Sequence, residues 1–461
     1  MHYCSTRGGV TGVSFTDSLL MGLAPDGGLL VPEQIPDLRE ELPDLQSLGF
    51  VELAKRVMDH FVTDIPQADL HRLIEQAYAT FDHADVVGVQ QLGQLNVIEL
   101  FHGPTLAFKD VALQLLGQLF NYVLAQRGEQ LNILGATSGD TGSAAIAGVR
   151  GQDNVNIFIL YPQGRVSTLQ ELQMTTVPDR NVHCVSVQGS FDDCQTLMKT
   201  AFSDLQFKAQ HQLGAVNSVN WARVMAQIVY YGYASLRYAG AAGAMDFVVP
   251  TGNFGNVFAA YLAKRMGFPI GQLHVATNDN DILARFFNSG EYARGDVHFT
   301  LAPAMDIQIA SNFERYLYYH FDEDPQRLSA FMQEFSDKGS AELDAPPNDG
   351  VFTGTAINGE ATLAAIASAY QQYDYVLDPH TAVGYAAYQQ ANLSETGVPT
   401  GLVATAHPAK FPDAVASALS VPVDHERIIH PRLEALRALP ERKQTIPATL
   451  EAVKGLFGNL R

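Results

Sequence analysis

From about residue 96 onward, the chain alternates short apolar runs with longer stretches of helical periodicity. Several apolar runs end in glycine, serine, threonine or asparagine just before the next helical stretch. This alternation is typical of βαβ units, in which helices join parallel strands and cover the faces of the sheet. The pattern therefore predicts an α/β protein that binds its ligand at the carboxyl ends of parallel strands. The predicted strands are 131–134, 156–161, 182–187, 247–249, 273–276, 375–377 and 402–405.

The length of 461 residues favours roughly two to three domains. Residues 1–95 form a predicted N-terminal domain that is mostly helical, with an amphipathic run at 50–60. We predict a large α/β domain from residues 96–130 and 226–461. Residues 131–225 form a predicted small α/β domain that closes on the substrate.

The bulk composition argues against several classes of partner. A net charge of -20 disfavours nucleic acid and anionic membranes. The sequence shows no long apolar run and no secretory signal pattern, so we expect a cytoplasmic protein. Cys4, Cys184 and Cys194 are odd in number and lack CxxC spacing, which predicts reduced thiols and neither a disulfide framework nor a metal site. A small anionic ligand stays compatible with the charge, because backbone N–H groups can hold it locally.

Lys109 has an unusual sequence environment. It follows the Gly103-Pro104 turn and several apolar residues, and it precedes the helical run 111–120. A lysine amine is a useful nucleophile only when neutral, and apolar surroundings favour that form. A surface lysine with an exposed ammonium group is the alternative for this residue taken alone. Lys109 is therefore a candidate Schiff-base lysine.

The segment 131–143 runs from a predicted strand through a turn rich in glycine and hydroxyl groups into an alanine-rich helix. Small residues allow a ligand close to the backbone, and the N–H groups of a helix start suit a carboxylate. An ordinary helix cap is an equally good interpretation of this turn by itself.

A second turn of this kind, with the sequence GNFGN, comprises Gly252, Asn253, Phe254, Gly255 and Asn256. It follows a predicted strand and precedes a helix, which makes it a candidate phosphate cradle. Its spacing fits neither GxGxxG nor the P-loop, so a monophosphate is the better guess. A plain strand-to-helix turn is the alternative.

Thr405 ends another predicted strand. A buried threonine hydroxyl needs a partner, and a ring nitrogen of a ligand would serve as well as a backbone carbonyl. Together, Lys109 suits an aldehyde, the GNFGN turn suits a phosphate and Thr405 suits a heterocyclic nitrogen. Pyridoxal 5′-phosphate carries all three groups.

Several separated stretches resemble the threonine synthases, which are pyridoxal-phosphate enzymes of fold type II. The resemblance covers most of the chain from residue 5 to residue 411 and implies a fold similar to the tryptophan synthase β subunit. That fold has two α/β lobes with parallel sheets, the cofactor between them, and here an N-terminal helical extension. The similar stretches are 5–8 (STRG), 22–28 (GLAPDGG), 101–110 (FHGPTLAFKD), 136–142 (ATSGDTG), 217–227 (NSVNWARVMAQ), 252–256 (GNFGN), 303–315 (PAMDIQIASNFER), 378–384 (DPHTAVG) and 405–411 (TAHPAKF).

The resemblance also implies residue roles. Lys109 would bind the cofactor aldehyde, residues 252–256 would cradle its phosphate, and Thr405 would face its pyridine nitrogen. The substrate carboxylate would be held by Ser138, Gly139 and Thr141, with Asp140 beside the 3′ oxygen of the cofactor. Lys410 and the stretch 217–227 are candidates for holding the substrate phosphate.

The implied enzyme is a carbon–oxygen lyase of threonine biosynthesis. It converts O-phospho-L-homoserine, a small anionic phosphorylated amino acid, and water into L-threonine and phosphate by γ-elimination and β-addition. One alternative is a threonine-synthase-like phospholyase or a serine/threonine dehydratase that uses the same cofactor. Another is a non-catalytic α/β protein that binds a phosphorylated metabolite. Shared motifs determine the cofactor and fold better than they determine the fate of the substrate.

Overall fold

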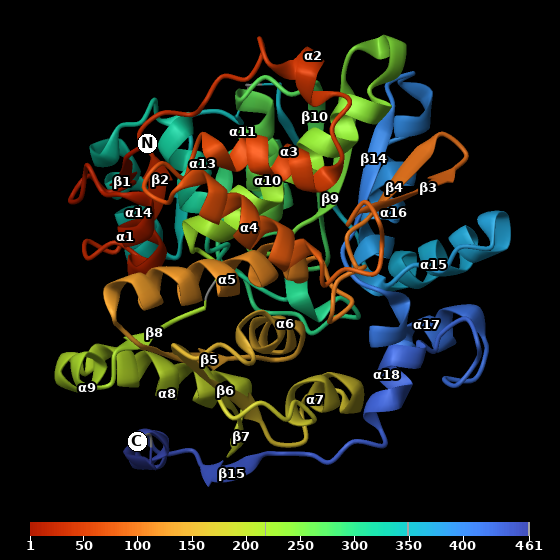
Figure 1. The fold of residues 1–461 in the computed structure, drawn as a ribbon. Coiled ribbons are helices and arrows are strands. Elements are labelled where there is room, and N and C mark those ends of the chain that lie inside the picture. Colours follow the sequence, from red (N-terminus) through yellow and green to blue (C-terminus); the bar gives the residue numbers. More distant parts are fainter. Residues whose placement is uncertain (217, 348–349, 460–461) are drawn as a thin grey trace. The chain divides into compact units, whose positions relative to one another are not determined.

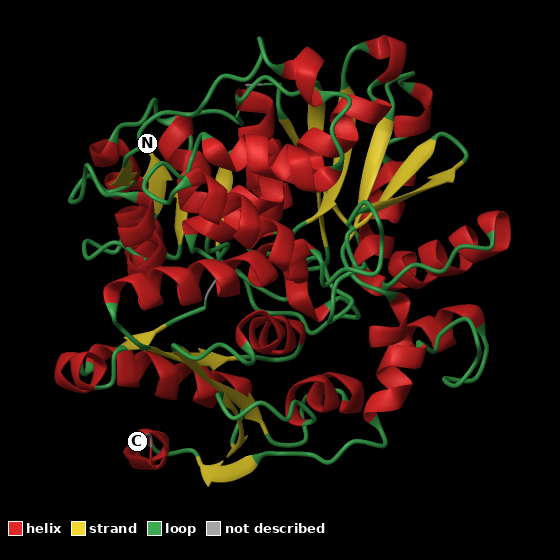
Figure 2. Ribbon diagram, viewed as in Figure 1, coloured by secondary structure: helices red, strands yellow, loops and turns green. Residues whose placement is uncertain are grey.

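The computed structural model describes residues 1–216, 218–347 and 350–459. The chain divides into two compact units, each built around its own sheet (Figures 1 and 2). The first unit contains Met1–Glu75, Phe81–Phe108 and Ser218–Ile428. The second contains Gln76–Thr80, Lys109–Asn217 and Ile429–Arg461.

The first unit is organised around a six-stranded sheet in the order β13-β10-β9-β14-β4-β3. All neighbouring strands are parallel except β3 and β4, which form an antiparallel hairpin. The strands are β3 (Gly88–Leu92), β4 (Leu95–Glu99), β9 (Met245–Pro250), β10 (Ile270–Thr277), β13 (Phe352–Ala356) and β14 (Thr400–Ala404). Because β9 and β14 are parallel neighbours, their carboxyl ends lie at the same edge of the sheet.

Helices and two small antiparallel pairs surround this sheet. The pairs are β1 (Tyr3–Ser5) with β2 (Leu30–Pro32), and β11 (Glu291–Ala293) with β12 (Ser340–Glu342). The α-helices that lie wholly or mainly in this unit are α1 (Phe15–Met21), α2 (Leu42–Leu45), α3 (Phe50–Asp59), α4 (Gln67–Tyr78), α10 (Trp221–Tyr238), α11 (Gly255–Arg265), α12 (Ile282–Ser289), α13 (Phe313–His320), α14 (Pro325–Lys338), α15 (Gly359–Tyr373), α16 (Pro379–Gln390) and α17 (Pro412–Leu419).

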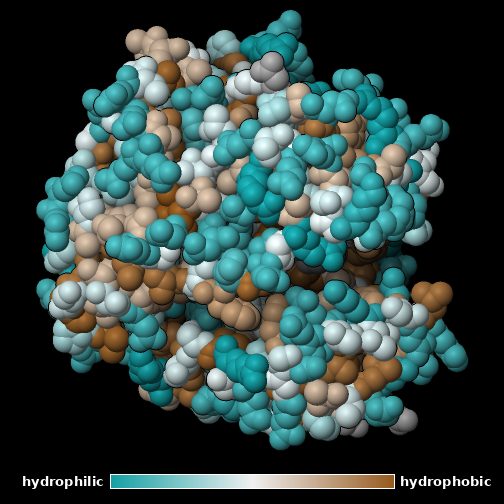
Figure 3. All heavy atoms as spheres, turned by 180° about the vertical axis from the view of Figure 1, so that it is seen from behind, coloured by the Kyte–Doolittle hydropathy of each residue, from teal (hydrophilic) through white to brown (hydrophobic). Residues whose placement is uncertain are grey.

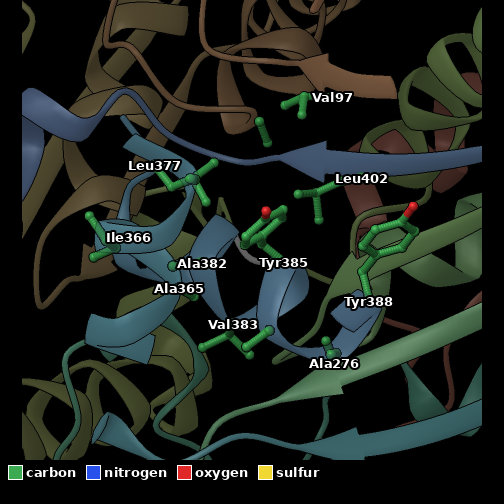
Figure 4. Close-up of a cluster of buried hydrophobic side chains, with 14 of the residues drawn as sticks. Val97, Ala276, Ala365, Ile366, Leu377, Ala382, Val383, Tyr385, Tyr388 and Leu402 are labelled. Carbon is green, nitrogen blue, oxygen red and sulfur yellow. The ribbon is translucent and has the colours of Figure 1, made fainter. Parts of the chain in front are cut away.

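A buried apolar cluster joins the sheet of the first unit to α15 and α16 (Figure 4). Val97 and Leu402 come from adjacent strands, and Ile366 and Val383 come from the two helices. Burial of these side chains holds α16 against the sheet, which matters because α16 begins next to residues of the site described below.

The second unit contains a five-stranded parallel sheet in the order β15-β7-β6-β5-β8. Its strands are β5 (Leu131–Ala136), β6 (Val155–Pro162), β7 (Val182–Gln188), β8 (Leu213–Gly214) and β15 (Gln444–Pro447). Its helices are α5 (Lys109–Arg127), α6 (Asp140–Val149), α7 (Thr168–Thr175), α8 (Phe191–Ser203), α9 (Leu205–Gln210), α18 (Pro431–Leu436) and α19 (Leu450–Gly455).

Two glycines bring α5 and α6 into backbone contact. A Cβ atom on Gly117 would lie 1.7 Å from the carbonyl oxygen of Gly148, and a Cβ on Gly148 would lie 2.3 Å from that of Leu113. No other residue type fits at either position without moving the helices apart. The glycine contact therefore sets the spacing of the two helices that begin at Lys109 and Asp140.

The C-terminal segment belongs to the second sheet. Strand β15 pairs in parallel with β7, and Ile446, Val453 and Phe457 are buried in the core of the second unit. The compact units thus group 109–127 and 429–461 with the second sheet. The domain boundaries predicted from the sequence stay a prediction.

Six of the seven predicted strands lie on observed strands, and the strand predicted at 375–377 is wrong. Those residues connect Asp374, the left-handed C-cap of α15 with φ 53°, to Asp378, the N-cap of α16. Leu377 is buried in the core, and the Tyr375 hydroxyl donates to Glu99 Oε1 at 2.7 Å. The apolar run reflects core packing and not sheet pairing.

Among the described residues, no helix has the length and apolar character that crossing a bilayer requires. On the face drawn in Figure 3, hydrophilic side chains are interspersed with apolar ones.

Candidate active site

Thr405 follows directly after β14 in the first unit and is 7% exposed. Its backbone is fully engaged, because its N–H donates to Thr381 Oγ1 at 3.1 Å and its carbonyl accepts the Phe108 N–H at 2.8 Å. Its side-chain Oγ1 is buried and has no hydrogen-bond partner among the described residues. A buried hydroxyl without a partner is costly, so this atom fits a ligand that supplies one.

A cluster at the start of α16 holds Thr405 in place. The Asp378 carboxylate is buried and accepts the Thr381 hydroxyl through Oδ2. Its other oxygen accepts the His380 Nδ1–H at 2.9 Å, and His380 Nε2 accepts the Ala304 N–H at 3.1 Å. These partners assign the ring proton of His380 to Nδ1. The cluster therefore links Thr405 to the segment around Ala304.

The GNFGN turn lies between β9 and α11, at the same sheet edge as Thr405. A Cβ atom on Gly252 would lie 2.8 Å from the carbonyl oxygen of Ala304, so the backbones approach closely here. Phe254 adopts a left-handed conformation with φ 64° as the N-cap of α11, and its ring is buried among other aromatic rings. The turn thus presents the N–H groups of a helix N-terminus, which suit an anion.

Asn256 is oriented by two tyrosines of α10. Its Oδ1 accepts the hydroxyls of Tyr230 at 2.5 Å and Tyr231 at 2.7 Å. Its buried Nδ2 has no partner among the described residues, so its N–H groups are donors for a ligand. Sequence reasoning missed both tyrosines, because nothing local to the GNFGN turn indicates them.

Lys109 and the turn at residues 138–141 both belong to the second unit. Lys109 is the first residue of α5, its side chain is 11% exposed, and its Nζ lies 4.0 Å from Asp140 Oδ2. Asp140 is the first residue of α6, where the helix dipole favours a carboxylate. Its Oδ1 accepts the amide of Gln170 at 2.9 Å, a contact that the sequence did not indicate.

The turn before α6 has a defined geometry. Thr137 Oγ1 accepts the N–H groups of Gly139 and Gly142, both at 3.0 Å, which closes the turn. Ser138 is exposed and Thr141 is half-buried, so both hydroxyls are accessible to a ligand. The predicted site residues therefore form two sets, with residues 252–256 and Thr405 in the first unit, and Lys109 and residues 138–141 in the second.

Lys410 holds the loop that precedes Lys109. It is 1% exposed, and its Nζ donates to the Thr105 carbonyl at 2.6 Å. The His407 N–H, shortly after the end of β14, donates to the Leu106 carbonyl of the same loop at 3.0 Å. A role of Lys410 in substrate phosphate binding stays a prediction.

The stretch 217–227 opens α10. Asn217 lies outside the described residues. Asn220 caps the helix by accepting the Ala222 N–H at 3.1 Å. Arg223 is buried, and burial lowers the pKa of its guanidinium to about 10, so it is charged at neutral pH.

The N-terminal motifs of the resemblance act as structural ties within the first unit. Asp26 accepts the Ser5 hydroxyl and the Gly9 N–H, both at 2.8 Å. Thr6 and Arg7 both bond to the Glu314 carboxylate of α13.

Three family models match the chain. Residues 97–405 match the model described as pyridoxal-phosphate dependent enzyme, residues 2–78 match threonine synthase N terminus, and residues 381–456 match threonine synthase, C-terminal. A threonine synthase of Pseudomonas aeruginosa is 47% identical over 424 residues, covering 91% of this chain and 90% of the relative.

Solved structures agree with the family models. The pyridoxal-phosphate-bound threonine synthase of Brucella melitensis superimposes with a TM-score of 0.94 at 45% identity, covering 99% of this chain and 98% of the other. Yeast threonine synthase gives a TM-score of 0.94 at 42% identity with the same coverage.

The fold and the matched models define a pyridoxal-phosphate-dependent enzyme of fold type II. Within this class, the chain belongs to the threonine synthase family. The predicted family, fold class, cofactor and enzyme class are confirmed. The residues present fit the cofactor, because Thr405 Oγ1 and Asn256 Nδ2 have no hydrogen-bond partners among the residues that the structure describes, and the GNFGN turn opens a helix.

Proposed function

We propose that the protein converts O-phospho-L-homoserine and water into L-threonine and phosphate, with pyridoxal 5′-phosphate held by Lys109, residues 252–256 and Thr405. The observation that carries the cofactor roles is the buried Thr405 hydroxyl, which follows a strand in a fold of this family and has no partner within residues 1–216, 218–347 and 350–459. When bound, the cofactor supplies an electron-accepting ring that makes protons next to the substrate nitrogen easier to remove.

Thr405 tunes this chemistry. A neutral hydroxyl facing the pyridine nitrogen does not hold that nitrogen in its protonated form, as a carboxylate would. With Thr405 at this position, the ring would be a milder electron acceptor than one that a carboxylate keeps protonated.

Lys109 is the proposed proton carrier. Its Nζ would take the proton from Cα of the substrate and would then move protons at Cβ. Asp140, 4.0 Å from the lysine nitrogen, stabilises the ammonium form after each removal.

The turn before α6 is the proposed carboxylate site. The hydroxyls of Ser138 and Thr141 and the backbone at Gly139 bind the substrate carboxylate at the helix start, which fixes the orientation of Cα relative to the base.

The test measures phosphate and threonine in the same tube after O-phospho-L-homoserine is added. We expect equal amounts of both products, and a loss of about a thousandfold or more in the Lys109→Ala protein. Lys443→Ala, which removes an exposed lysine that pairs with Glu171 and Glu441, is the matched control and should keep wild-type activity.

Two outcomes would contradict the proposal. Phosphate release with a 2-oxo acid or aldehyde in place of threonine would favour the phospholyase or dehydratase. Turnover by the Lys109→Ala protein near the wild-type rate would remove Lys109 from its role.

A further inference from the structure

Arg315, on α13 in the first unit, is a completely buried cation. Its guanidinium donates to the carbonyl of Leu30 at 3.0 and 2.9 Å, to the carbonyl of Val219 at 2.6 Å and to Asn312 Oδ1 at 2.5 Å. All these acceptors are neutral. In the described parts of the chain, no carboxylate forms an ion pair with Arg315, and the adjacent Glu314 pairs with Arg7.

Such a charge is costly to bury. Burial lowers the pKa of the Arg315 guanidinium to about 9, so the group is still charged at neutral pH. Carbonyl and amide oxygens satisfy its N–H donors but do not neutralise its charge. An anion bound nearby would be stabilised by this charge in a medium of low dielectric constant.

Asn312 connects Arg315 to the GNFGN turn. Because its Oδ1 accepts from Arg315, its Nδ2 is directed to the carbonyls of Asn253 at 3.2 Å and Ser218 at 3.1 Å. Its backbone N–H also donates to the Asn253 carbonyl at 3.0 Å. A Cβ on Gly255 would lie 3.1 Å from Nδ2 of the Asn312 side chain, so this side chain packs directly against the turn.

Ser311, which precedes Asn312 in the chain, holds the side chain of Asn253. Ser311 Oγ donates to Asn253 Oδ1 at 3.2 Å and is hydrogen-bonded to Ser218 Oγ at 2.7 Å. The carbonyl and the side-chain oxygen of Asn253 are thus both occupied by donors from residues 311–312.

We propose that Arg315, acting through Asn312, is a positioning residue for the phosphate cradle and that its charge raises the affinity of the cradle for the phosphate of the cofactor. This inference rests on the proposed assignment of residues 252–256 to that phosphate. By fixing the Asn253 carbonyl on Asn312, the pair leaves the N–H groups of the turn available to the anion.

The discriminating measurement compares two aldehydes on the apoenzyme, pyridoxal 5′-phosphate and pyridoxal, which lacks the phosphate. The absorption of the lysine-bound aldehyde gives both dissociation constants. Arg315→Met and Asn312→Ala should weaken binding of pyridoxal 5′-phosphate by about 10- to 100-fold and change binding of pyridoxal by less than about threefold. Arg315→Lys, which keeps the charge but not the planar donor set, should recover part of the loss.

Two further variants separate this inference from the assignment of the cradle. Arg7→Met removes the arginine that bonds to the neighbouring Glu314 and should lower thermal stability without changing the ratio of the two dissociation constants. Gly252→Ala places a Cβ against Ala304 in the turn itself and should weaken binding of the phosphorylated aldehyde alone.

The outcomes are distinct. If Gly252→Ala raises the dissociation constant of pyridoxal 5′-phosphate relative to that of pyridoxal while Arg315→Met and Asn312→Ala do not, Arg315 has no role in phosphate binding and the cradle stands. If Gly252→Ala leaves the ratio unchanged, both the cradle and this inference are wrong. Should Arg315→Met fail to fold, as judged by circular dichroism, Arg315→Lys and Asn312→Ala decide the question by the same ratio.

Discussion

Thr405 illustrates, for a single residue, how a binding role can be separated from a structural one. Its buried Oγ1 has no hydrogen-bond partner in the part of the chain that the structure describes, so the hydroxyl contributes nothing to the apoenzyme that a methyl group would not. Thr405→Val should therefore leave the free energy of unfolding of the apoenzyme unchanged or raise it. The loss of the proposed hydrogen bond to the cofactor ring should lower kcat/KM by about tenfold.

The control for Thr405→Val lies at the start of β14, the strand that Thr405 follows. Thr400 is also buried, but its hydroxyl donates to the Val398 carbonyl at 3.3 Å at the other end of β14. Thr400→Val should lower stability and leave kcat/KM unchanged. Equal effects of the two substitutions on both quantities would remove the ring-facing role of Thr405.

The three cysteines give a second prediction for single residues. Burial raises the pKa of the Cys184 thiol to about 12 and that of Cys194 to about 11, and it also raises the pKa of Cys4. Since only the thiolate reacts, a disulfide reagent at pH 8 should label none of them rapidly in the native protein and all three in denaturant. Rapid native labelling of any one thiol would show that it is accessible and ionised.

At the scale of helices and strands, the contact between α5 and α6 is the most sensitive to a small change. Gly117→Ala would force a methyl group against the Gly148 carbonyl. We expect a loss of about 1–3 kcal/mol in the free energy of unfolding, measured with urea, and a lower kcat. Activity falls because the two helices carry Lys109 and Asp140 at their first positions.

Gly455→Ala in α19 is the matched control, because a Cβ atom at this position would have no atom of the described residues within 4 Å. It should change neither stability nor kcat appreciably. If Gly117→Ala lowered stability but left kcat unchanged, the helix contact would not set the position of Lys109, the proposed catalytic residue.

The elements found by sequence reasoning are those with local signals. The strands that precede residues 138–141, the GNFGN turn and Thr405 were predicted, because an apolar run followed by small and hydroxylated residues is visible within a dozen positions. The run 375–377 was predicted wrongly, because burial against a helix and burial in a sheet give the same apolar pattern.

The supports of the site could not be predicted in this way. Tyr230 and Tyr231 meet Asn256 from 26 and 25 residues away, and Arg315 bonds to the Leu30 carbonyl across 285 residues. Such contacts depend on the tertiary fold, and a single sequence contains no local signal for them. For the same reason, the pairing of β15 with β7 was not predicted.

For the molecule as a whole, the C-terminal segment completes the core of the second unit around His183. The His183 ring stacks on Phe158 at 4.4 Å with an interplanar angle of 8°, and Phe457 packs 4.4 Å from Phe158. Burial, aided by the charge of Arg442, lowers the pKa of His183 below its usual 6.5. Burial also lowers the pKa of His430, at the start of α18 in the same unit.

These lowered pKa values make the second unit sensitive to acid. Between the native pKa and about 6.5, the unfolded chain binds more protons than the native protein, so the free energy of unfolding falls as the pH falls through this window. Above it, the two histidines cause no pH dependence. The His183→Phe protein should therefore lose less stability than the wild type between pH 7 and pH 5. Adding His430→Gln should flatten the dependence of the free energy of unfolding on pH further.

Amide hydrogen exchange of residues 155–188 measures the stability of the second unit. The fluorescence of Trp221, the one tryptophan of the chain, reports on the first unit and should show no effect of either substitution. Parallel stability curves for the wild type and both variants would show that neither histidine carries the acid sensitivity.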